Sequence, residues 1–284
     1  MGSGDGGDTR FKLLVIPMEW PVANLIVCFG ARIGVRFNDR QLSRRLARRL
    51  PPHAEVEPWG PANRVYSVQS TGGVPKEYAL LRNRTAIMRS GSADQVIDLL
   101  ASDLNECVAR FASDLFVHAG VVGWKGKAIV IPGRSMSGKS TLVAELIRQG
   151  ASYYSDEYAV IGEDGWVHGY PKPLSLRRAK GNPRSLSAKS LGAKVGTKRL
   201  PLGMIVVTKY SPGVDWKPRP LSEAESMMAL IANTVMARAH PEMTMQRLRR
   251  AVQRTHGFEG RRGDARETAH AILHSADRLF RATS

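Results

Sequence analysis

The clearest chemical signal in this sequence is a glycine-rich run that ends in lysine and serine. It matches the pattern G-x-x-x-x-G-K-[ST] in full and comprises Gly133, Arg134, Ser135, Met136, Ser137, Gly138, Lys139 and Ser140. Glycines permit a tight turn whose backbone N–H groups converge on phosphate oxygens, while the lysine reaches the β- and γ-phosphates and the hydroxyl ligates Mg²⁺. An ordinary strand-to-helix turn has no need of lysine followed by serine. The motif therefore predicts that this run and Thr141 bind nucleotide phosphates.

A pair of carboxylates, Asp156 and Glu157, follows seventeen residues after Lys139, where a short strand at 153–155 ends. An acidic residue at the end of a strand beside a phosphate loop faces the nucleotide and its metal. Asp156 is thus a candidate magnesium ligand or a candidate proton acceptor for an attacking hydroxyl. Neighbouring side chains on an extended chain point to opposite faces, so one acid is expected to enter the site at close range. The competing interpretation is a solvated acidic turn.

A histidine, His118, lies in an apolar strand at 116–122, just before the phosphate loop. A lone histidine in such a strand is more often a hydrogen-bonded core residue than a catalyst. Its place immediately upstream of the loop nevertheless makes it a third candidate. From the residues alone, both interpretations stay open.

The segments His-Ala-Gly-Val-Val at 118–122, the phosphate loop, and Tyr-Ser-Asp-Glu at 154–157 together resemble the catalytic domain of HPr kinase/phosphorylase. Their order and approximate spacing agree with that family from residue 116 to about 162. The resemblance implies an α/β fold with a P-loop kinase core of the HPr kinase and phosphoenolpyruvate carboxykinase type. It also implies an ATP- and Mg²⁺-dependent kinase that phosphorylates a hydroxyl, which in the family is a seryl group of a carrier protein.

Carried over residue by residue, the resemblance makes Asp156 the catalytic base and places His118 near the reacting groups. It also assigns binding of the phosphates to Lys139. Ser140, Asp156 and Glu157 become the metal ligands, although the family has a second Asp where this chain has Glu157. Arg177 is a candidate anion contact, because 174–177 is a faint counterpart of the family's Glu-Ile-Arg-Gly segment.

The family's Arg-Pro-Gly-Arg-Asn segment is barely echoed at 217–220, which leaves phosphorolysis and HPr recognition open. We therefore expect a divergent member whose acceptor is a different peptide or protein serine, or a small molecule. Lasso-peptide tailoring clusters contain such kinases, which act on a peptide serine.

The elements that must position these residues follow from apolar periodicity. Residues 1–10 form a Gly- and Asp-rich tail, and 11–112 form a small α+β module with strands at 13–16, 25–29, 33–37, 65–68, 78–82 and 85–89 and helices at 41–50 and 93–112. Residues 113–284 form the P-loop domain, with strands at 116–122, 128–131, 153–155, 158–161 and 203–207 and helices at 141–148, 222–237, 241–254 and 265–281. The basic run at 247–262 is expected on the outer face of a helix.

The chain is strongly basic, with 42 Lys and Arg against 25 Asp and Glu and a formal charge of +17. Basic residues without any acid interrupt the Ser-, Gly- and Pro-rich stretch 178–199: Arg178, Lys180, Arg184, Lys189, Lys194, Lys198 and Arg199. This predicts a mobile basic loop that acts as a lid or docks an anionic substrate, unless it is merely solvated. It holds no aromatic residue, which disfavours single-stranded nucleic acid as the partner.

Two isolated cysteines, Cys28 and Cys107, exclude a thiolate zinc site and a disulfide framework and fit a reducing cytoplasm. No apolar run approaches the roughly 18 residues of a membrane span, and the first ten residues do not resemble a signal peptide. Three functions remain: a cytoplasmic hydroxyl kinase, a regulatory P-loop module without phosphoryl transfer, and a nucleic-acid-associated ATPase. The sequence leaves the acceptor, the phosphate donor and the oligomeric state open.

Overall fold

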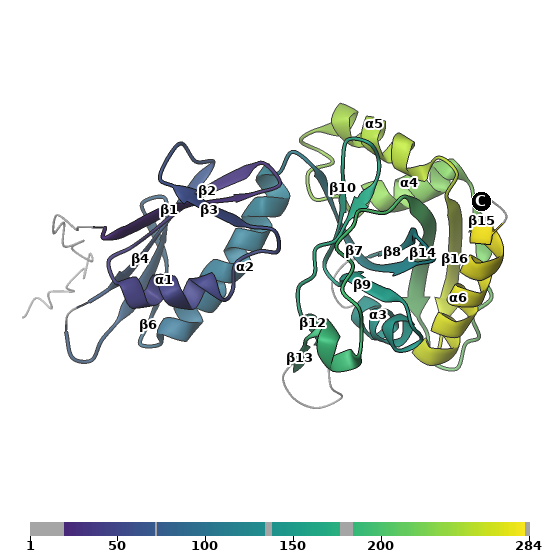
Figure 1. The fold of residues 1–284 in the computed structure, drawn as a ribbon, viewed down its shortest axis with the longest axis horizontal. Helices are drawn as coiled ribbons and strands as arrows, with labels where there is room; N and C mark the ends of the chain where they lie inside the picture. The colour runs from purple at the N-terminus through teal and green to yellow at the C-terminus, as the bar shows by residue number, and fades with distance from the viewer. Residues whose placement is uncertain (1–19, 72, 134–137, 177–183, 282–284) are drawn as a thin grey trace, which may run out of the picture.

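A computed structural model describes residues 20–71, 73–133, 138–176 and 184–281 (Figure 1). These residues form a mixed α/β structure with two large mixed sheets, as the sequence predicts in general terms. The expected strand at 13–16, loop residues 134–137 and Arg177 lie outside the described residues. No helix in the described ranges has both the length and the apolar character needed to cross a membrane.

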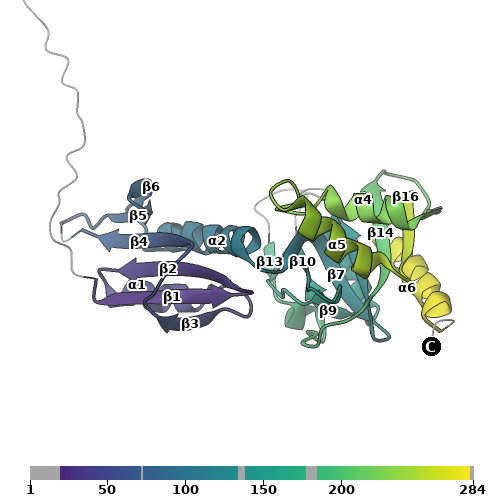
Figure 2. The same ribbon diagram turned by 90° about the horizontal axis from the view of Figure 1, so that it is seen from above.

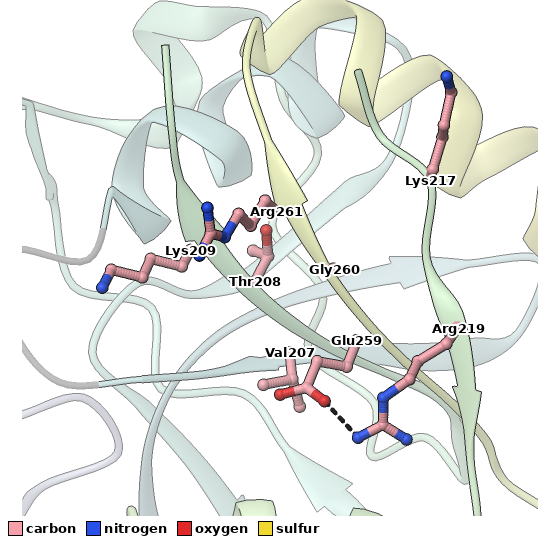
Figure 3. A pocket seen from close by; sticks show the side chains of 8 residues that line it. All are labelled: Val207, Thr208, Lys209, Lys217, Arg219, Glu259, Gly260 and Arg261. Carbon is pink, nitrogen blue, oxygen red and sulfur yellow. Dashed lines mark hydrogen bonds and ion pairs between the residues drawn. The ribbon is translucent and has the colours of Figure 1, made fainter. Parts of the chain in front are cut away.

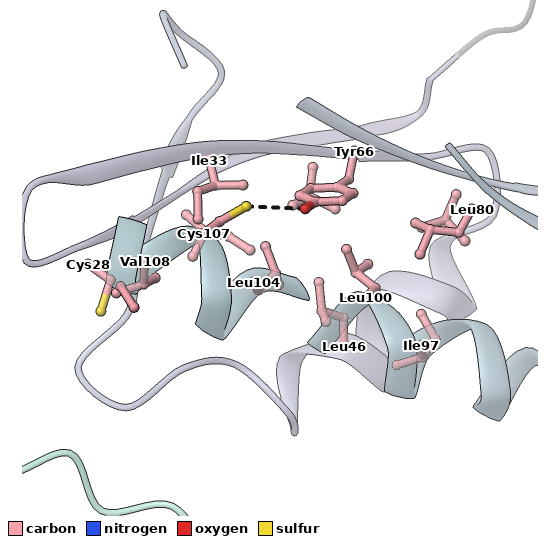
Figure 4. Packing of buried hydrophobic residues seen from close by; sticks show 14 of the residues in the cluster. Cys28, Ile33, Leu46, Tyr66, Leu80, Ile97, Leu100, Leu104, Cys107 and Val108 are labelled. Carbon is pink, nitrogen blue, oxygen red and sulfur yellow. Dashed lines mark hydrogen bonds between the residues drawn. The ribbon is translucent and has the colours of Figure 1, made fainter. Parts of the chain in front are cut away.

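The first sheet contains six strands from the described N-terminal residues, in the order β3-β1-β2-β4-β5-β6. Their bounds are β1 (Val22–Cys28), β2 (Ala31–Phe37), β3 (Glu55–Pro58), β4 (Arg64–Ser70), β5 (Tyr78–Arg82) and β6 (Thr85–Ser90). Helices α1 (Arg40–Ala47) and α2 (Ala93–Phe111) begin at the caps Asp39 and Ser92, whose side chains accept hydrogen bonds from backbone N–H groups of their first turns. Apolar residues of α2, including Leu100 and Leu104, pack on the buried Tyr66 of β4 (Figure 4).

The second sheet follows the order β11-β10-β7-β8-β14-β16-β15, and β9 also pairs with β7. Its strands are β7 (Leu115–Trp124), β8 (Lys127–Pro132), β9 (Ser152–Ser155), β10 (Tyr158–Ile161), β11 (Val167–His168), β14 (Leu202–Tyr210), β15 (Arg219–Leu221) and β16 (His256–Arg262). Strands β8, β14 and β16 run parallel to one another, and β7 runs antiparallel to β8. A separate pair, β12 (Leu174–Leu176) and β13 (Arg184–Leu186), and the short helix η1 (Ala188–Leu191) lie between β11 and β14 along the chain.

Helices cover both faces of the second sheet (Figures 1 and 2). Helices α3 (Lys139–Arg148) and α6 (Ala265–Arg281) pack with Ile129, Ile131, Met204 and Val206. Helices α4 (Glu223–Ile231) and α5 (Pro241–Val252) pack with Val130 and Ile205 on the opposite face. Alternate residues of β8 and β14 therefore serve two apolar cores, as expected for strands buried on both faces.

Aromatic side chains join the two sheets' units where α2 meets β7. The ring of Phe29 packs edge-on against Phe116 with centroids 5.6 Å apart, and the Tyr170 hydroxyl donates to Asn105 Oδ1 at 2.6 Å. Both Tyr170 and Phe116 are essentially inaccessible to solvent. The N-terminal unit therefore shares a packed core with the unit that holds the phosphate loop.

The structure corrects two expectations on the C-terminal side. The basic run at 247–262 is not one helix, because α5 ends at Val252 and residues 256–262 form β16. The expected helix 222–237 ends at Ile231, and residues 232–240 form turns. The segment His-Gly-Phe-Glu-Gly-Arg-Arg lacks apolar alternation, so its pairing with β14 and not its own pattern makes it a strand.

Gly120 of β7 is required by the close approach of α3. A Cβ atom built there lies 2.5 Å from Cγ2 of Val143 in α3, and a helical valine has little rotamer freedom with which to yield. We expect Gly120→Ala to lower the free energy of unfolding by about 1–3 kcal/mol, as overpacking does, when measured by urea denaturation. Gly91→Ala is the matched control, because no atom lies within 4 Å of its added Cβ. Equal stability of the two variants would contradict the close packing.

Both cysteines are buried and free, and burial raises the pKa of the Cys28 thiol from 9.0 to about 12. Only the thiolate reacts with alkylating agents. At pH 8 we expect native Cys28 to react with iodoacetamide roughly 10³-fold more slowly than an unperturbed thiol, because each pKa unit is a factor of ten in thiolate. Mass spectrometry of native and urea-unfolded protein measures this difference, and rapid native labelling of Cys28 would contradict it.

Candidate functional site

The phosphate-loop motif lies between the end of β8 and the start of α3. Backbone N–H of Gly133 donates to the carbonyl of His118 at 3.0 Å, which fixes the loop's entry to β7. At the loop's exit, Gly138 precedes α3 with φ of 83°, a left-handed conformation that favours glycine. Residues Arg134, Ser135, Met136 and Ser137 lie outside the described residues.

Lys139 is the first residue of α3, and Ser140 and Thr141 follow it in the first turn. Burial lowers the pKa of Lys139, while the carboxylates of Asp156 and Glu157 act in the opposite direction. The motif lysine and the acidic pair are therefore electrostatic neighbours. A partly desolvated cation at a helix N-terminus is a favourable place for an anion.

The acidic pair occupies a break between two strands that lie end to end along β7. Strand β9 pairs with residues 121–123 and β10 with residues 115–118 of the same strand. Between them, the carbonyl of Glu157 accepts a hydrogen bond from Ala119 N–H at 3.1 Å, and Ala119 is the register partner of Pro132 in β8. The acids thus lie across β7 from the loop, two strand spacings or roughly 10 Å from β8.

Lys172, which the sequence analysis did not single out, forms an ion pair with Glu157. The Tyr153 hydroxyl donates to the Lys172 carbonyl. A backbone group of Asp156 forms a hydrogen bond with the same hydroxyl. Pro173 restricts Lys172, the residue before it, to extended backbone, and Pro171 on the other side has a fixed φ of its own; these two flanking prolines were the available signal. Glu157 is therefore held toward Lys172.

The backbone of His118 lies on β7 between the loop and the acidic pair. Its N–H donates to the Asn233 carbonyl at 2.8 Å, its carbonyl accepts from Gly133, and its ring lies 4.9 Å from the Tyr158 ring. Like Gly120, it belongs to the set of alternate β7 residues on the α3 side. The structure brings His118, Lys139, Asp156 and Glu157 to one end of the sheet, whereas Arg177 lies outside the described residues.

The second residue that the sequence analysis missed is Arg262, the last residue of β16. It is 2% exposed and donates from Nη2 to the Gly138 carbonyl at 2.8 Å and from Nη1 to the Gly263 carbonyl at 3.4 Å. Its guanidinium lies 5.5 Å from the centroid of the Tyr210 ring, and burial lowers its pKa. Arg262 thus ties the exit of the phosphate loop to a strand two places along the sheet.

The described part of the basic segment 178–199 is anchored to β9. Tyr153 N–H donates to the Lys194 carbonyl and Gly196 N–H to the Tyr153 carbonyl, both at 2.8 Å. Arg199 pairs with Asp164 and lies over the Trp166 ring at 5.3 Å. From Arg184 onward the segment contains β13 and η1, so this half is part of the packed domain and not a free loop.

The donors suited to a divalent cation are the Ser140 hydroxyl and the carboxylates of Asp156 and Glu157. Hard oxygen donors of this kind fit Mg²⁺, which is usually held by one or two carboxylates together with substrate phosphates. Within the described residues, no group of three or more His, Cys, Asp or Glu side chains converges on a common point. The donor set fits a metal that the nucleotide helps to bind better than a metal held by protein alone.

Neither the protein-family models nor the curated proteins contain a match to this chain. The chemistry of the site therefore rests on its own residues. Lys139, the α3 N-terminus and Arg262 form a cationic side, and Asp156 with Glu157 forms a carboxylate side across β7. Such an arrangement can bind an anion at one end and accept a proton or hold a cation at the other.

Arg262 should act on the loop exit more than on global stability. In Arg262→Met the Gly138 carbonyl loses a charge-assisted hydrogen bond, worth about 1.5–3 kcal/mol. We expect amide hydrogen exchange in the first turn of α3 to accelerate about 10- to 100-fold, while amides of β14 keep their protection. Lys127→Met, a lysine of β8 at the opposite end of the strand, is the control. Uniform acceleration throughout the sheet would contradict a local role.

Proposed function

We propose that this protein is an ATP- and Mg²⁺-dependent kinase that transfers the γ-phosphate to a hydroxyl group of a peptide, protein or small molecule. Its C-terminal unit would then be a divergent P-loop kinase core of the HPr kinase type, in line with the motif resemblance. The observation that carries the proposal is the electrostatic neighbourhood of Lys139 and the acidic pair, arranged on either side of β7.

In this proposal the cationic side binds the nucleotide. Backbone N–H groups of the loop and the Lys139 ammonium hold the β- and γ-phosphates, and the N-terminus of α3 adds its dipole. Arg262 keeps the Gly138 carbonyl turned toward β16 and so positions the loop exit. Partial burial of Lys139 strengthens its attraction to phosphate, because desolvation lowers the local dielectric response.

Ser140 and the two carboxylates would hold Mg²⁺, which when bound offsets charge on the β- and γ-phosphates. Because Glu157 already pairs with Lys172, Asp156 is the better candidate for proton acceptance. The acceptor oxygen attacks the γ-phosphorus, its proton passes to the Asp156 carboxylate, and the bond between the γ-phosphorus and the bridging oxygen breaks to release ADP. His118 lies on the α3 face of β7 and would orient the acceptor or the phosphate.

A phosphate loop alone serves regulatory modules equally well, and only the carboxylate side distinguishes a transferase from them. The acid pair lies in a strand break, where Ser155 Oγ accepts from the N–H groups of Glu157 and Tyr158 at 3.2 and 3.0 Å. Those bonds give the break a defined backbone path. A fixed carboxylate beside the phosphate lysine is what proton acceptance requires.

The test is incubation of the purified protein with γ-labelled ATP, Mg²⁺ and a panel of serine peptides and hydroxyl metabolites. We expect Lys139→Ala to lower ATP affinity at least 10-fold, and Asp156→Asn to lower transfer at least 10²-fold with little change in ATP affinity. The reason is that lysine binds the phosphates, whereas the carboxylate acts in transfer.

Asp98→Asn is the matched control, since Asp98 is an exposed acid on α2 that pairs with Arg49. It should leave both ATP binding and transfer unchanged. ATP binding without labelling of any acceptor would favour the regulatory module, and an Asp156→Asn variant with full transfer activity would remove Asp156 as the base.

A further inference from the structure

Two adjoining cavities lie along β14 and β16 of the second sheet. One, of about 510 Å³, is bounded by the ends of β14 and β16 and by the loop before β15 (Figure 3). The other, of about 490 Å³, lies between α4 and the sheet and reaches Pro132 and Asn233. They share Val207, Arg219 and Glu259, so together they form one groove that leads to the base of the phosphate loop.

The groove contains two cations in direct register. Lys209 of β14 and Arg261 of β16 are register partners in the sheet, and both side chains are exposed. Within the described part of the chain neither has an ion pair, whereas Arg219 is neutralised by Glu225 and Glu259. Like charges directly opposite each other destabilise a sheet. An anion bound between them would remove that repulsion.

The position of the pair separates it from the proposed nucleotide phosphates. The next residues in register, Tyr210 and Arg262, face α3 and the loop exit, as the bond from Arg262 to Gly138 requires. Lys209 and Arg261 therefore face the α4 side, because successive strand residues point to opposite faces. Both pairs stand at the carboxyl ends of parallel strands, where open α/β sheets bind their ligands.

Much of the remaining wall of the groove is apolar, and its acids Glu225 and Glu259 are both paired with Arg219. Met228 of α4 is 60% exposed, and Leu221, Ala224, Ala229 and Ala232 line the same cavity. An occupant must therefore combine anionic groups with an apolar side chain. A short peptide with acidic and aliphatic residues has that chemistry, and inorganic phosphate or a sugar lacks the apolar part.

We propose that this groove binds the phosphoryl acceptor, and that the acceptor is an acidic peptide segment with the reactive serine beside glutamate or aspartate and an aliphatic residue. This inference rests on the proposed kinase function. Carboxylates of the segment pair with Lys209 and Arg261, its aliphatic side chain lies against Met228, and its serine points toward Pro132 and the phosphate loop.

The test is binding of a fluorescein-labelled peptide, Leu-Glu-Ser-Glu-Glu-Leu, by fluorescence anisotropy at low salt, against the same peptide with glutamine for glutamate. Wild-type protein should bind the acidic peptide about 2- to 30-fold more tightly, the range for two exposed charge pairs, and salt should reduce the difference. Lys209→Ala/Arg261→Ala should abolish it. Equal binding of the two peptides by wild type would overturn the inference.

Arg44→Ala/Arg48→Ala is the matched control, because it removes the same charge at exposed positions of the first unit. It should keep the preference for the acidic peptide. A second variant, Lys209→Glu, separates loss of binding from loss of folding. It places opposite charges in register, so it should raise the melting temperature while it abolishes the preference for the acidic peptide. A destabilised Lys209→Glu variant, or one that still prefers the acidic peptide, would contradict the proposed pair.

A second arm separates this inference from the nucleotide site and from transfer. ATP affinity of Lys209→Ala/Arg261→Ala should stay within 2-fold of wild type, whereas Lys139→Ala lowers it. Loss of ATP affinity without loss of peptide preference would assign the pair to the nucleotide and overturn the inference. Peptide binding needs no phosphoryl transfer, so a preference for acidic peptide together with inactivity would count against the kinase and not against the groove.

Discussion

The arrangement of this site depends on the backbone hydrogen bonds along the two edges of β7. On one edge its His118 carbonyl accepts from Gly133, and on the other its Ala119 N–H donates to the Glu157 carbonyl. Consecutive residues of one strand therefore hold the entry of the phosphate loop and the acidic pair. Backbone bonds of this kind hold without regard to side-chain rotamers, so the distance between the two halves of the site is set by strand spacing.

The same end of the sheet holds one buried and one partly buried cation. Lys139 and Arg262 both have pKa values lowered by burial, and an anion in their midst would favour their charged forms. Partial desolvation of a cation costs stability even where carboxylates lie near it, as Asp156 and Glu157 do for Lys139. In the proposed function, part of this cost would return as affinity when phosphate binds. The N-terminal unit, joined through Phe29, Phe116 and Tyr170, contributes packing that offsets it.

What the sequence could predict is confined to short-range patterns. The mixed α/β character, the helix after the motif and the strand that ends before Asp156 all follow from local periodicity and turn residues, and the structure has them. The sequence did not point to Arg262 or Lys172, because their roles arise from a hydrogen bond across 124 residues and from an ion pair with Glu157, 15 residues away. The sequence did not predict strand β16 either, since Gly257 and Gly260 interrupt its apolar alternation and β14 supplies its register.

Part of the excess of basic residues in the chain has defined positions in the second sheet. Register pairs at the ends of β14 and β16 alternate between faces, so Arg262 serves the phosphate-loop side while Lys209 and Arg261 serve the groove beside α4. In the proposed function, one strand pair would thereby present positive charge to two neighbouring anions without placing both on one surface. A phosphoryl donor and an acidic acceptor repel each other, and cations interposed at the carboxyl ends of these strands are what would allow them to approach.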